Sequence, residues 1–276
     1  MKKAISLILA LVLSLGVAVS AFAEGSKLDS ILALGQITFA TSPDFAPLEF
    51  INPNEEGDAQ YVGSDIELAK YIAEKLGVTL VIKPMDFGAA LAAVTQGQVD
   101  MVISGLAWKE DRAENMELSA YFNMDDEGGQ GLLVRAGEGA NYATAEAFSG
   151  KTVAAQISSL QYNLVSEQLP ADVTLKTFSN INESVLALIN GRVDAVAVDT
   201  TNGELIINSN GSDKIELASF TFDYSSEGNV LAVTKGETEL IEAINEILAE
   251  VNELGLYKVW KDDAEALAKS LGIETY

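Results

Sequence analysis

The sequence contains no cysteine and no histidine. These absences exclude disulfides, thiolate nucleophiles, Ser-His-Asp triads and histidine-ligated zinc. Beyond the N-terminal segment there is also no second long apolar run, so we expect a mature protein without a membrane span. A chain without disulfides must be stabilised by its core, and a hydrophobic content of 48% is ample for one.

Basic side chains are scarce as well. Lys and Arg number 17 against 41 Asp and Glu, which gives a net charge of −24. An acidic surface of this kind repels phosphate backbones and argues against nucleic acid as a partner. We interpret it as a solvated face that keeps the protein soluble.

The first 23 residues are typical of a secretory signal peptide. Lys2-Lys3 precede an apolar run from Ala4 to Val19, and Ala21-Phe22-Ala23 is a small-residue cleavage site before Glu24. A membrane anchor is the alternative, but the run is short for a span. No cysteine follows the site for lipid attachment, so we expect a free periplasmic or secreted protein.

Apolar runs alternate with helical patterns along the rest of the chain. This alternation predicts an α/β fold with mostly parallel sheets flanked by helices. We expect a helix that opens with Ser64 or Asp65 as its N-cap and ends at Gly77. The other elements include strands at Gly35–Thr41, Val78–Ile82 and Val99–Ser104, a second series after Tyr121, a long helix at Glu237–Leu254, and a short last helix.

One pattern occurs twice. Gly97-Gln98-Val99-Asp100 and Gly191-Arg192-Val193-Asp194 each place a glycine after a helix, then one polar residue, then Val-Asp at the start of an apolar run. The repeat predicts two similar lobes instead of one long sheet.

Two charged residues follow the apolar runs that this pattern introduces. Arg112 lies just beyond the run that stops at Ser104-Gly105, where an arginine can grip a carboxylate with two hydrogen bonds. The alternative is an ordinary solvated loop arginine. Asp199 ends the second run, and a charge at a buried strand end needs a partner. Its alternative role is to cap a helix that begins at Thr200.

The sequence resembles the family 3 solute-binding proteins, the secreted amino-acid receptors of ABC importers. Gly63-Ser64-Asp65-Ile66-Glu67-Leu68 is similar to a family signature, although Ser64 replaces the usual large apolar residue. The segment from Gly97 to Arg112 resembles the one that ends in the family's carboxylate-binding arginine. The likeness covers essentially the whole mature chain.

This resemblance implies two α/β lobes, two hinge crossings and a ligand enclosed between the lobes (a type II periplasmic-binding-protein fold that closes on its ligand). It places the crossings near Gln130–Val134 and Gly228–Val233. We therefore expect a signal peptide at 1–23, lobe 1 at 24–131, lobe 2 at 132–229, and a return to lobe 1 at 230–276.

The resemblance also implies roles for single residues. Arg112 corresponds to the residue that pairs with the ligand α-carboxylate, and Ser159 and Leu160 to a helix N-terminus that donates N–H groups to it. Asp199 corresponds to the acid that receives the α-ammonium, helped by groups around Ser104 and Gly105. Phe45 and Phe87 correspond to aromatic walls around the ligand side chain, and core packing is their alternative role. The other matching positions are the backbone N–H of Ala107 and the side chains of Gln156 and Ser42.

Two of these positions depart from the family pattern. Ala107 stands where many relatives have a hydroxyl, so one hydrogen bond to the ligand is lost. Ser42 stands where relatives that take basic amino acids often have an acid, which argues against a lysine or arginine ligand without excluding it.

We therefore expect a monomeric substrate-binding protein, not an enzyme, that captures a free amino acid and delivers it to an ABC transporter permease. No cofactor and no metal are expected. The alternatives are a secreted cyclohexadienyl (prephenate or arogenate) dehydratase on the same fold, with Glu49 or Glu227 as general acid, and a sensor ectodomain.

Overall fold

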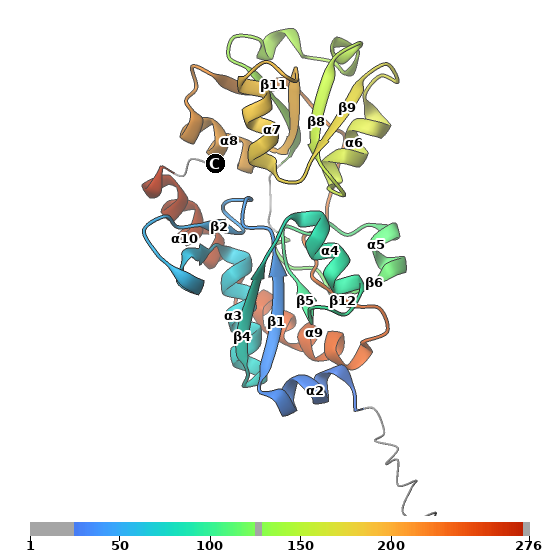
Figure 1. Ribbon diagram of the computed structural model, residues 1–276, viewed down its shortest axis with the longest axis vertical. Helices are drawn as coiled ribbons and strands as arrows, with labels where there is room; N and C mark the ends of the chain where they lie inside the picture. Colours follow the sequence, from blue (N-terminus) through green and yellow to red (C-terminus); the bar gives the residue numbers. More distant parts are fainter. Residues whose placement is uncertain (1–24, 125–128, 273–276) are drawn as a thin grey trace, which may run out of the picture.

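Two five-stranded sheets, each flanked by helices, form the two lobes of the molecule (Figure 1). The structure is a computed structural model, and it describes residues 25–124 and 129–272. The predicted signal peptide lies outside the described residues. Within them, no helix combines the length and the apolar character that crossing a membrane requires.

The first sheet has the strand order β4-β1-β5-β12-β6. Its strands are β1 (Gln36–Thr41), β4 (Thr79–Pro84), β5 (Met101–Val102), β6 (Met116–Leu118) and β12 (Ala232–Thr234). One core lies between this sheet and the helices α3 (Ser64–Leu76) and α9 (Thr238–Glu253), and a second lies under α4 (Phe87–Thr95). The lobe also contains α2 (Lys27–Leu34), α5 (Glu110–Asn115), the 3-10 helix η1 (Gly57–Gln60) and the small sheet of β2 (Phe50–Ile51) and β3 (Tyr61–Val62).

The second sheet has the order β11-β7-β10-β8-β9. Its strands are β7 (Gln130–Arg135), β8 (Thr152–Gln156), β9 (Thr174–Phe178), β10 (Ala195–Asp199) and β11 (Ile215–Thr221). One core packs under α6 (Leu160–Gln168) with the 3-10 helices η2 (Gly139–Asn141) and η3 (Ala145–Phe148). The other packs under α7 (Ile181–Ile189) and α8 (Thr200–Asn210).

The two sheets share one topology. In each, three neighbouring strands run parallel, and the next strand runs antiparallel to them. The antiparallel strand is β12 in the first sheet and β7 in the second, so in each lobe it is the strand that enters from the other lobe. The predicted α/β fold with two lobes is confirmed.

The crossings differ from their predicted positions. Gln130–Arg135 is strand β7 of the second sheet, and Ala232–Thr234 is strand β12 of the first. The chain passes between the lobes before each of these strands, near an antiparallel bridge between Phe122 and Asn229. The first predicted range falls on strand β7, whereas the second, Gly228–Val233, begins before β12 and includes Asn229 of this bridge. The exact lobe boundaries remain a prediction.

The last helix is also longer than the short helix predicted. α10 (Leu256–Leu271) has 16 residues and buries Tyr257, Ala264 and Ala268 along one side. These residues recur at helical spacing, which places them on one face. α10 contacts α3 in the first lobe and α8 in the second, so the C-terminal helix touches both lobes (Figure 1).

The repeated Val-Asp pattern has a structural cause. Asp100 accepts hydrogen bonds from the backbone N–H and the hydroxyl of Thr38 in β1, both at 2.7 Å. Asp194 accepts one from the backbone N–H of Thr152 in β8 at 2.9 Å. The aspartate before β5 therefore holds β1 in the first lobe, and the aspartate before β10 holds the start of β8 in the second.

This role predicts the effect of removing the carboxylate. Asp100→Ala leaves two half-buried donors of Thr38 without their acceptor, so we expect a loss of about 1–3 kcal/mol in the free energy of unfolding. Chemical denaturation measures it, with the exposed Asp58→Ala as control. Equal midpoints for the two variants would show that the Asp100 contacts do not stabilise the lobe.

Candidate functional site

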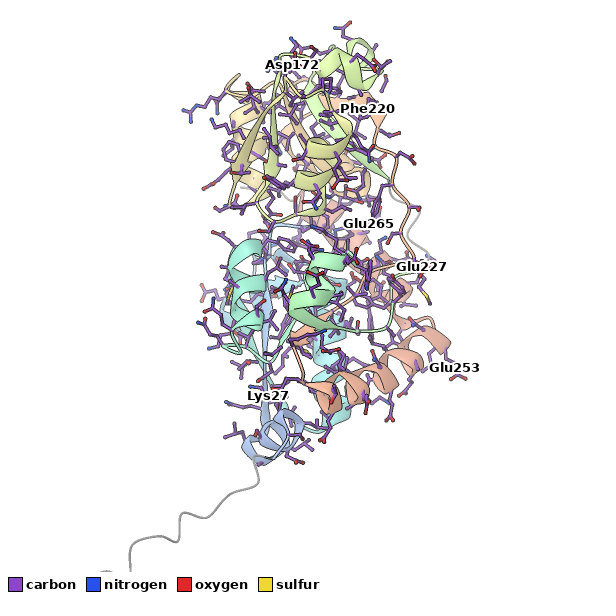
Figure 2. The ribbon with its side chains drawn as sticks, turned by 90° about the vertical axis from the view of Figure 1, so that its right-hand side faces the viewer. Lys27, Asp172, Phe220, Glu227, Glu253 and Glu265 are labelled. Atoms are coloured by element: carbon purple, nitrogen blue, oxygen red, sulfur yellow. The ribbon has the colours of Figure 1, made fainter. Side chains whose placement is uncertain are left out.

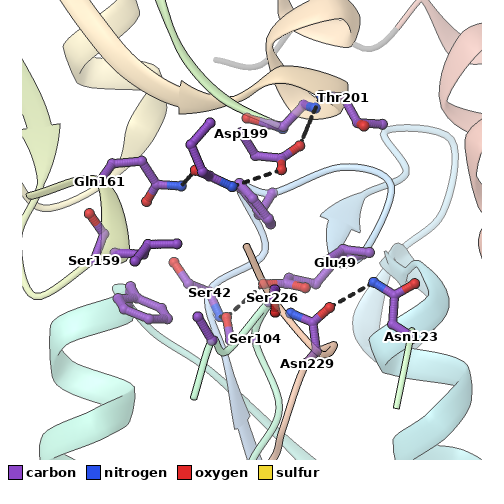
Figure 3. Close-up of a pocket in the computed structure, with 18 of the residues that line it drawn as sticks. Ser42, Glu49, Ser104, Asn123, Ser159, Gln161, Asp199, Thr201, Ser226 and Asn229 are labelled. Carbon is purple, nitrogen blue, oxygen red and sulfur yellow. Dashed lines mark hydrogen bonds between the residues drawn. The ribbon is translucent and has the colours of Figure 1, made fainter. Parts of the chain in front are cut away.

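A cavity of about 100 Å³ lies between the two lobes. Every residue proposed from the sequence for ligand binding lines it. The carboxyl ends of β1, β5, β8 and β10 all lead into it, because parallel strands end at the same edge of a sheet. Figure 3 shows Asp199 and Gln161 on the second-lobe side facing Ser42, Ser104 and Glu49 on the first-lobe side.

Arg112 is a buried cation. Its side chain is 4% exposed, so the solvated-loop alternative is wrong. The guanidinium donates to the carbonyl of Ala107 at 2.6 Å and to the carbonyl of Ser158 at 3.0 Å, and it lies 5.5 Å from the ring centre of Phe87. No described carboxylate forms an ion pair with it. Burial lowers the pKa of Arg112 to about 10, partly offset by the charge of Asp111, so the residue stays charged.

Helix α6 begins beside this guanidinium. Ser159 is its N-cap and accepts a hydrogen bond from the N–H of Tyr162 at 3.1 Å. Ser158 before it adopts a left-handed conformation with φ +64°, which turns the chain into the helix. The first N–H groups of a helix have no partner within it and favour an anion. Arg112 and this helix start together provide positive charge and N–H donors on one side of the cavity.

Asp199 caps a helix at the wall of the cavity. One carboxylate oxygen caps α8 by accepting from the N–H groups of Thr201 at 2.9 Å and Asn202 at 3.1 Å. The other accepts from the side-chain amide of Gln130 at 3.1 Å. The helix-cap alternative is therefore correct, and the same carboxylate lines the cavity.

Gln156 does not point a free amide at a ligand. Its NH₂ group donates to Asp44 at 3.1 Å and to the carbonyl of Ser179 at 3.2 Å. Ser42 is also engaged, because its hydroxyl donates to Asp44 at 2.7 Å and its N–H to Ser104 at 3.0 Å. The sequence analysis overlooked Asp44, although a carboxylate in the turn after a strand end is a recognisable signal.

The aromatic residues serve both purposes proposed for them. Phe45 packs against Gly105, where an added Cβ would lie 2.9 Å from the ring. It also contacts apolar clusters of both lobes. Phe87 is 7% exposed and belongs to the core under α4. Both rings line the cavity, so core packing and wall formation are not exclusive.

Buried polar side chains connect the cavity wall at Ser104 and Gly105 to the C-terminal helix. Glu49 accepts a hydrogen bond from the hydroxyl of Ser104 at 2.7 Å. Asp65 accepts from the N–H of Gly105 at 2.8 Å and from the hydroxyl of Tyr257 in α10. The N-cap of α3 is Gly63, so the expected N-cap role of Ser64 or Asp65 is wrong. Asp65 supports the Gly105 backbone instead.

Glu49 and Asp65 form a buried carboxyl pair. The Oε2 atom of Glu49 is buried and receives no hydrogen bond from the described residues. Burial first, and the charge of Asp65 second, raise the pKa of Glu49 well above its ordinary value. A proton on Glu49 removes one of two neighbouring charges and lets it donate to Asp65. We therefore assign the proton to Glu49.

Comparison with known proteins adds to this geometry. Residues 37–263 match the model of the bacterial extracellular solute-binding proteins, family 3. The chain is 24% identical to the L-cystine-binding protein TcyJ of Escherichia coli, over 92% of this chain and 91% of the relative. It is 28% identical to the arginine-binding extracellular protein ArtP of Bacillus subtilis, over 82% and 86%.

Two solved structures are similar to this chain over most of their length. The amino acid ABC transporter substrate-binding protein AbpA of Streptococcus pneumoniae, bound to L-arginine, superposes with a TM-score of 0.79 at 29% identity, covering 87% of this chain and 98% of that one. An ancestral arginine-binding protein bound to glutamine gives 0.74 at 34% identity, covering 83% and 97%.

The carboxyl pair predicts a pH-dependent stability. Because folding raises the pKa of Glu49, its contribution is complete below the ordinary value of 4.5 and is lost as the pH rises through the folded-state value. Glu49→Gln keeps an acceptor for Ser104 and a donor toward Asp65 at every pH. We expect this variant to lose less stability than wild type as the pH rises above the ordinary value of 4.5.

Thermal unfolding across this range measures the difference, and the exposed Glu55→Gln is the control. Parallel curves for wild type and Glu49→Gln would show that Glu49 does not carry a proton in the folded protein.

Proposed function

The chain belongs to family 3 of the bacterial extracellular solute-binding proteins, and on this basis we propose that Arg112 and Asp199 hold the two ends of one amino acid between the lobes. The protein is an amino-acid-binding receptor of an ABC transport system, as its relatives are. It is not an enzyme, because the similar proteins are transport receptors.

The buried guanidinium of Arg112 is the observation that carries the proposal. Removing a cation from water is costly unless an anion accompanies it. Arg112 has two carbonyl partners and no described carboxylate partner, and it lies beside the N-terminus of α6. This arrangement suits the α-carboxylate of an amino acid, held by a guanidinium and by backbone N–H groups.

The α-ammonium is assigned to the opposite side of the cavity. Asp199 supplies a carboxylate there, and Ser104 supplies a hydroxyl oxygen from the first lobe. Arg112 belongs to the first sheet's lobe and Asp199 to the second, so both ends are bound only when the lobes are close. A ligand that gains contacts only in the closed arrangement shifts the protein toward it.

The dehydratase alternative has no support in the site. Glu227 lies on the segment that connects the lobes, at the edge of the molecule (Figure 2). Glu49 is engaged by Ser104 and paired with Asp65. The similar proteins named above are transport receptors, so the transport function is favoured over the dehydratase.

The cellular setting follows from the family. Its members are extracellular or periplasmic proteins, and this chain works in that setting. We propose that the leader is removed after Ala23, that the receptor acts as a free monomer, and that it delivers its amino acid to a membrane permease.

We expect Arg112→Ala to weaken amino-acid binding by about 2–5 kcal/mol, because it removes one side of a buried charge pair. Arg112→Lys is expected to be intermediate, since a point charge replaces a planar fork. Asp199→Asn removes the charge but keeps a side chain that caps helices well, so it is expected to weaken binding by a similar amount and still fold.

A thermal-shift screen of the twenty amino acids selects the ligand, because binding raises the unfolding temperature. Calorimetry then measures its affinity for each variant. Wild-type affinity in folded Arg112→Ala would move the carboxylate site elsewhere, and no shift with any amino acid would contradict the proposed function.

A further inference from the structure

A contact between the lobes forms part of the cavity wall. Asp44 follows β1 in the first lobe, and its carboxylate lies against the start of α7 and the end of β8 in the second. The role inferred here for Asp44 rests on the proposed function, which places an amino acid in this cavity.

The carboxylate of Asp44 is well supplied with donors. Its Oδ2 atom accepts from the N–H of Ile181 at 2.8 Å and from the amide of Gln156 at 3.1 Å. Its Oδ1 atom accepts from the hydroxyl of Ser42 at 2.7 Å. Ile181 is the first residue of α7, so the helix N-terminus also favours the negative charge.

These bonds leave Asp44 unsuited to a guanidinium. Bidentate recognition needs a free lone pair on each carboxylate oxygen. Two donors from the second lobe already occupy Oδ2, so only Oδ1 has capacity for a further bond. A cationic ligand side chain finds no two-point partner here, and an anionic side chain is repelled by the charge of Asp44.

The same contact also limits the space on this side of the cavity. Asp44 and Gln156 line the cavity, so their contact limits how far a ligand side chain extends.

We propose that the ligand side chain extends toward Asp44 and that Asp44 determines the specificity of the site: by bridging the lobes there, it restricts the ligand to a small, uncharged amino acid.

Calorimetric titration of wild type with L-serine, L-threonine, L-glutamine, L-lysine, L-arginine and L-glutamate tests the ligand class. We expect the tightest binding for L-serine, L-threonine or L-glutamine. Tightest binding of arginine, lysine or glutamate would overturn this inference and leave the proposed function intact. Binding of no amino acid would contradict both.

Variants test the role of Asp44 itself. Asp44→Ala enlarges the side-chain end, so the affinity ratio of glutamine to serine is expected to rise by about tenfold or more, in line with the effect of one missing group in a pocket. A residue that merely supported the fold would change both affinities equally. An unchanged ratio would therefore overturn the assignment.

Two further variants complete the experiment. Asp44→Ser also shortens the side chain but keeps one hydrogen-bonding group, so it provides a folded alternative if the alanine variant unfolds; the same rise in the ratio is expected, and an unchanged ratio contradicts the role. Asp86→Asn removes an exposed charge whose field reaches Asp44 without touching its hydrogen bonds. Its ratio is expected to equal that of wild type, and a rise as large as in Asp44→Ala would assign specificity to charge alone.

Discussion

A buried guanidinium that forms no ion pair with any carboxylate in the described part of the chain is the constraint on which the site depends. Arg112 is held by two carbonyls and stacked near Phe87, and burial lowers its pKa without neutralising it. A charge in this position is a cost to the folded protein unless it receives an anion. The first lobe therefore carries a site that is electrostatically incomplete, and an α-carboxylate completes it.

The duplicated fold explains why the rest of the site forms around this residue. Each lobe directs the carboxyl ends of its parallel strands toward the other, and each fixes its first strand with an aspartate, Asp100 or Asp194. The strand ends of one lobe then carry Ser42 and Ser104, and those of the other carry Gln156 and Asp199. Small polar groups from two lobes meet in one cavity, which suits a ligand with two charged ends.

Much of this arrangement was predictable from the sequence, because strand ends and helix starts have local signals. Arg112 and Asp199 were found by their places after apolar runs, and the repeated Val-Asp pattern predicted two lobes. Long-range partners had no such signal. Nothing local shows that Asp65 binds the N–H of Gly105 instead of capping α3, or that Gln156 donates to Asp44 across the cleft. The first predicted crossing falls on β7, because nothing in that apolar run separates a connecting segment from a buried strand.

The central claim is that one lobe binds the carboxylate of an amino acid and the other its ammonium. Calorimetry with three forms of the same ligand tests it most directly: the free amino acid, its α-carboxamide and its N-acetyl derivative. The account predicts that blocking either end weakens binding by about 2–5 kcal/mol, because each block leaves Arg112 or Asp199 without its charged partner. Binding of either blocked form as tightly as the free amino acid would contradict it.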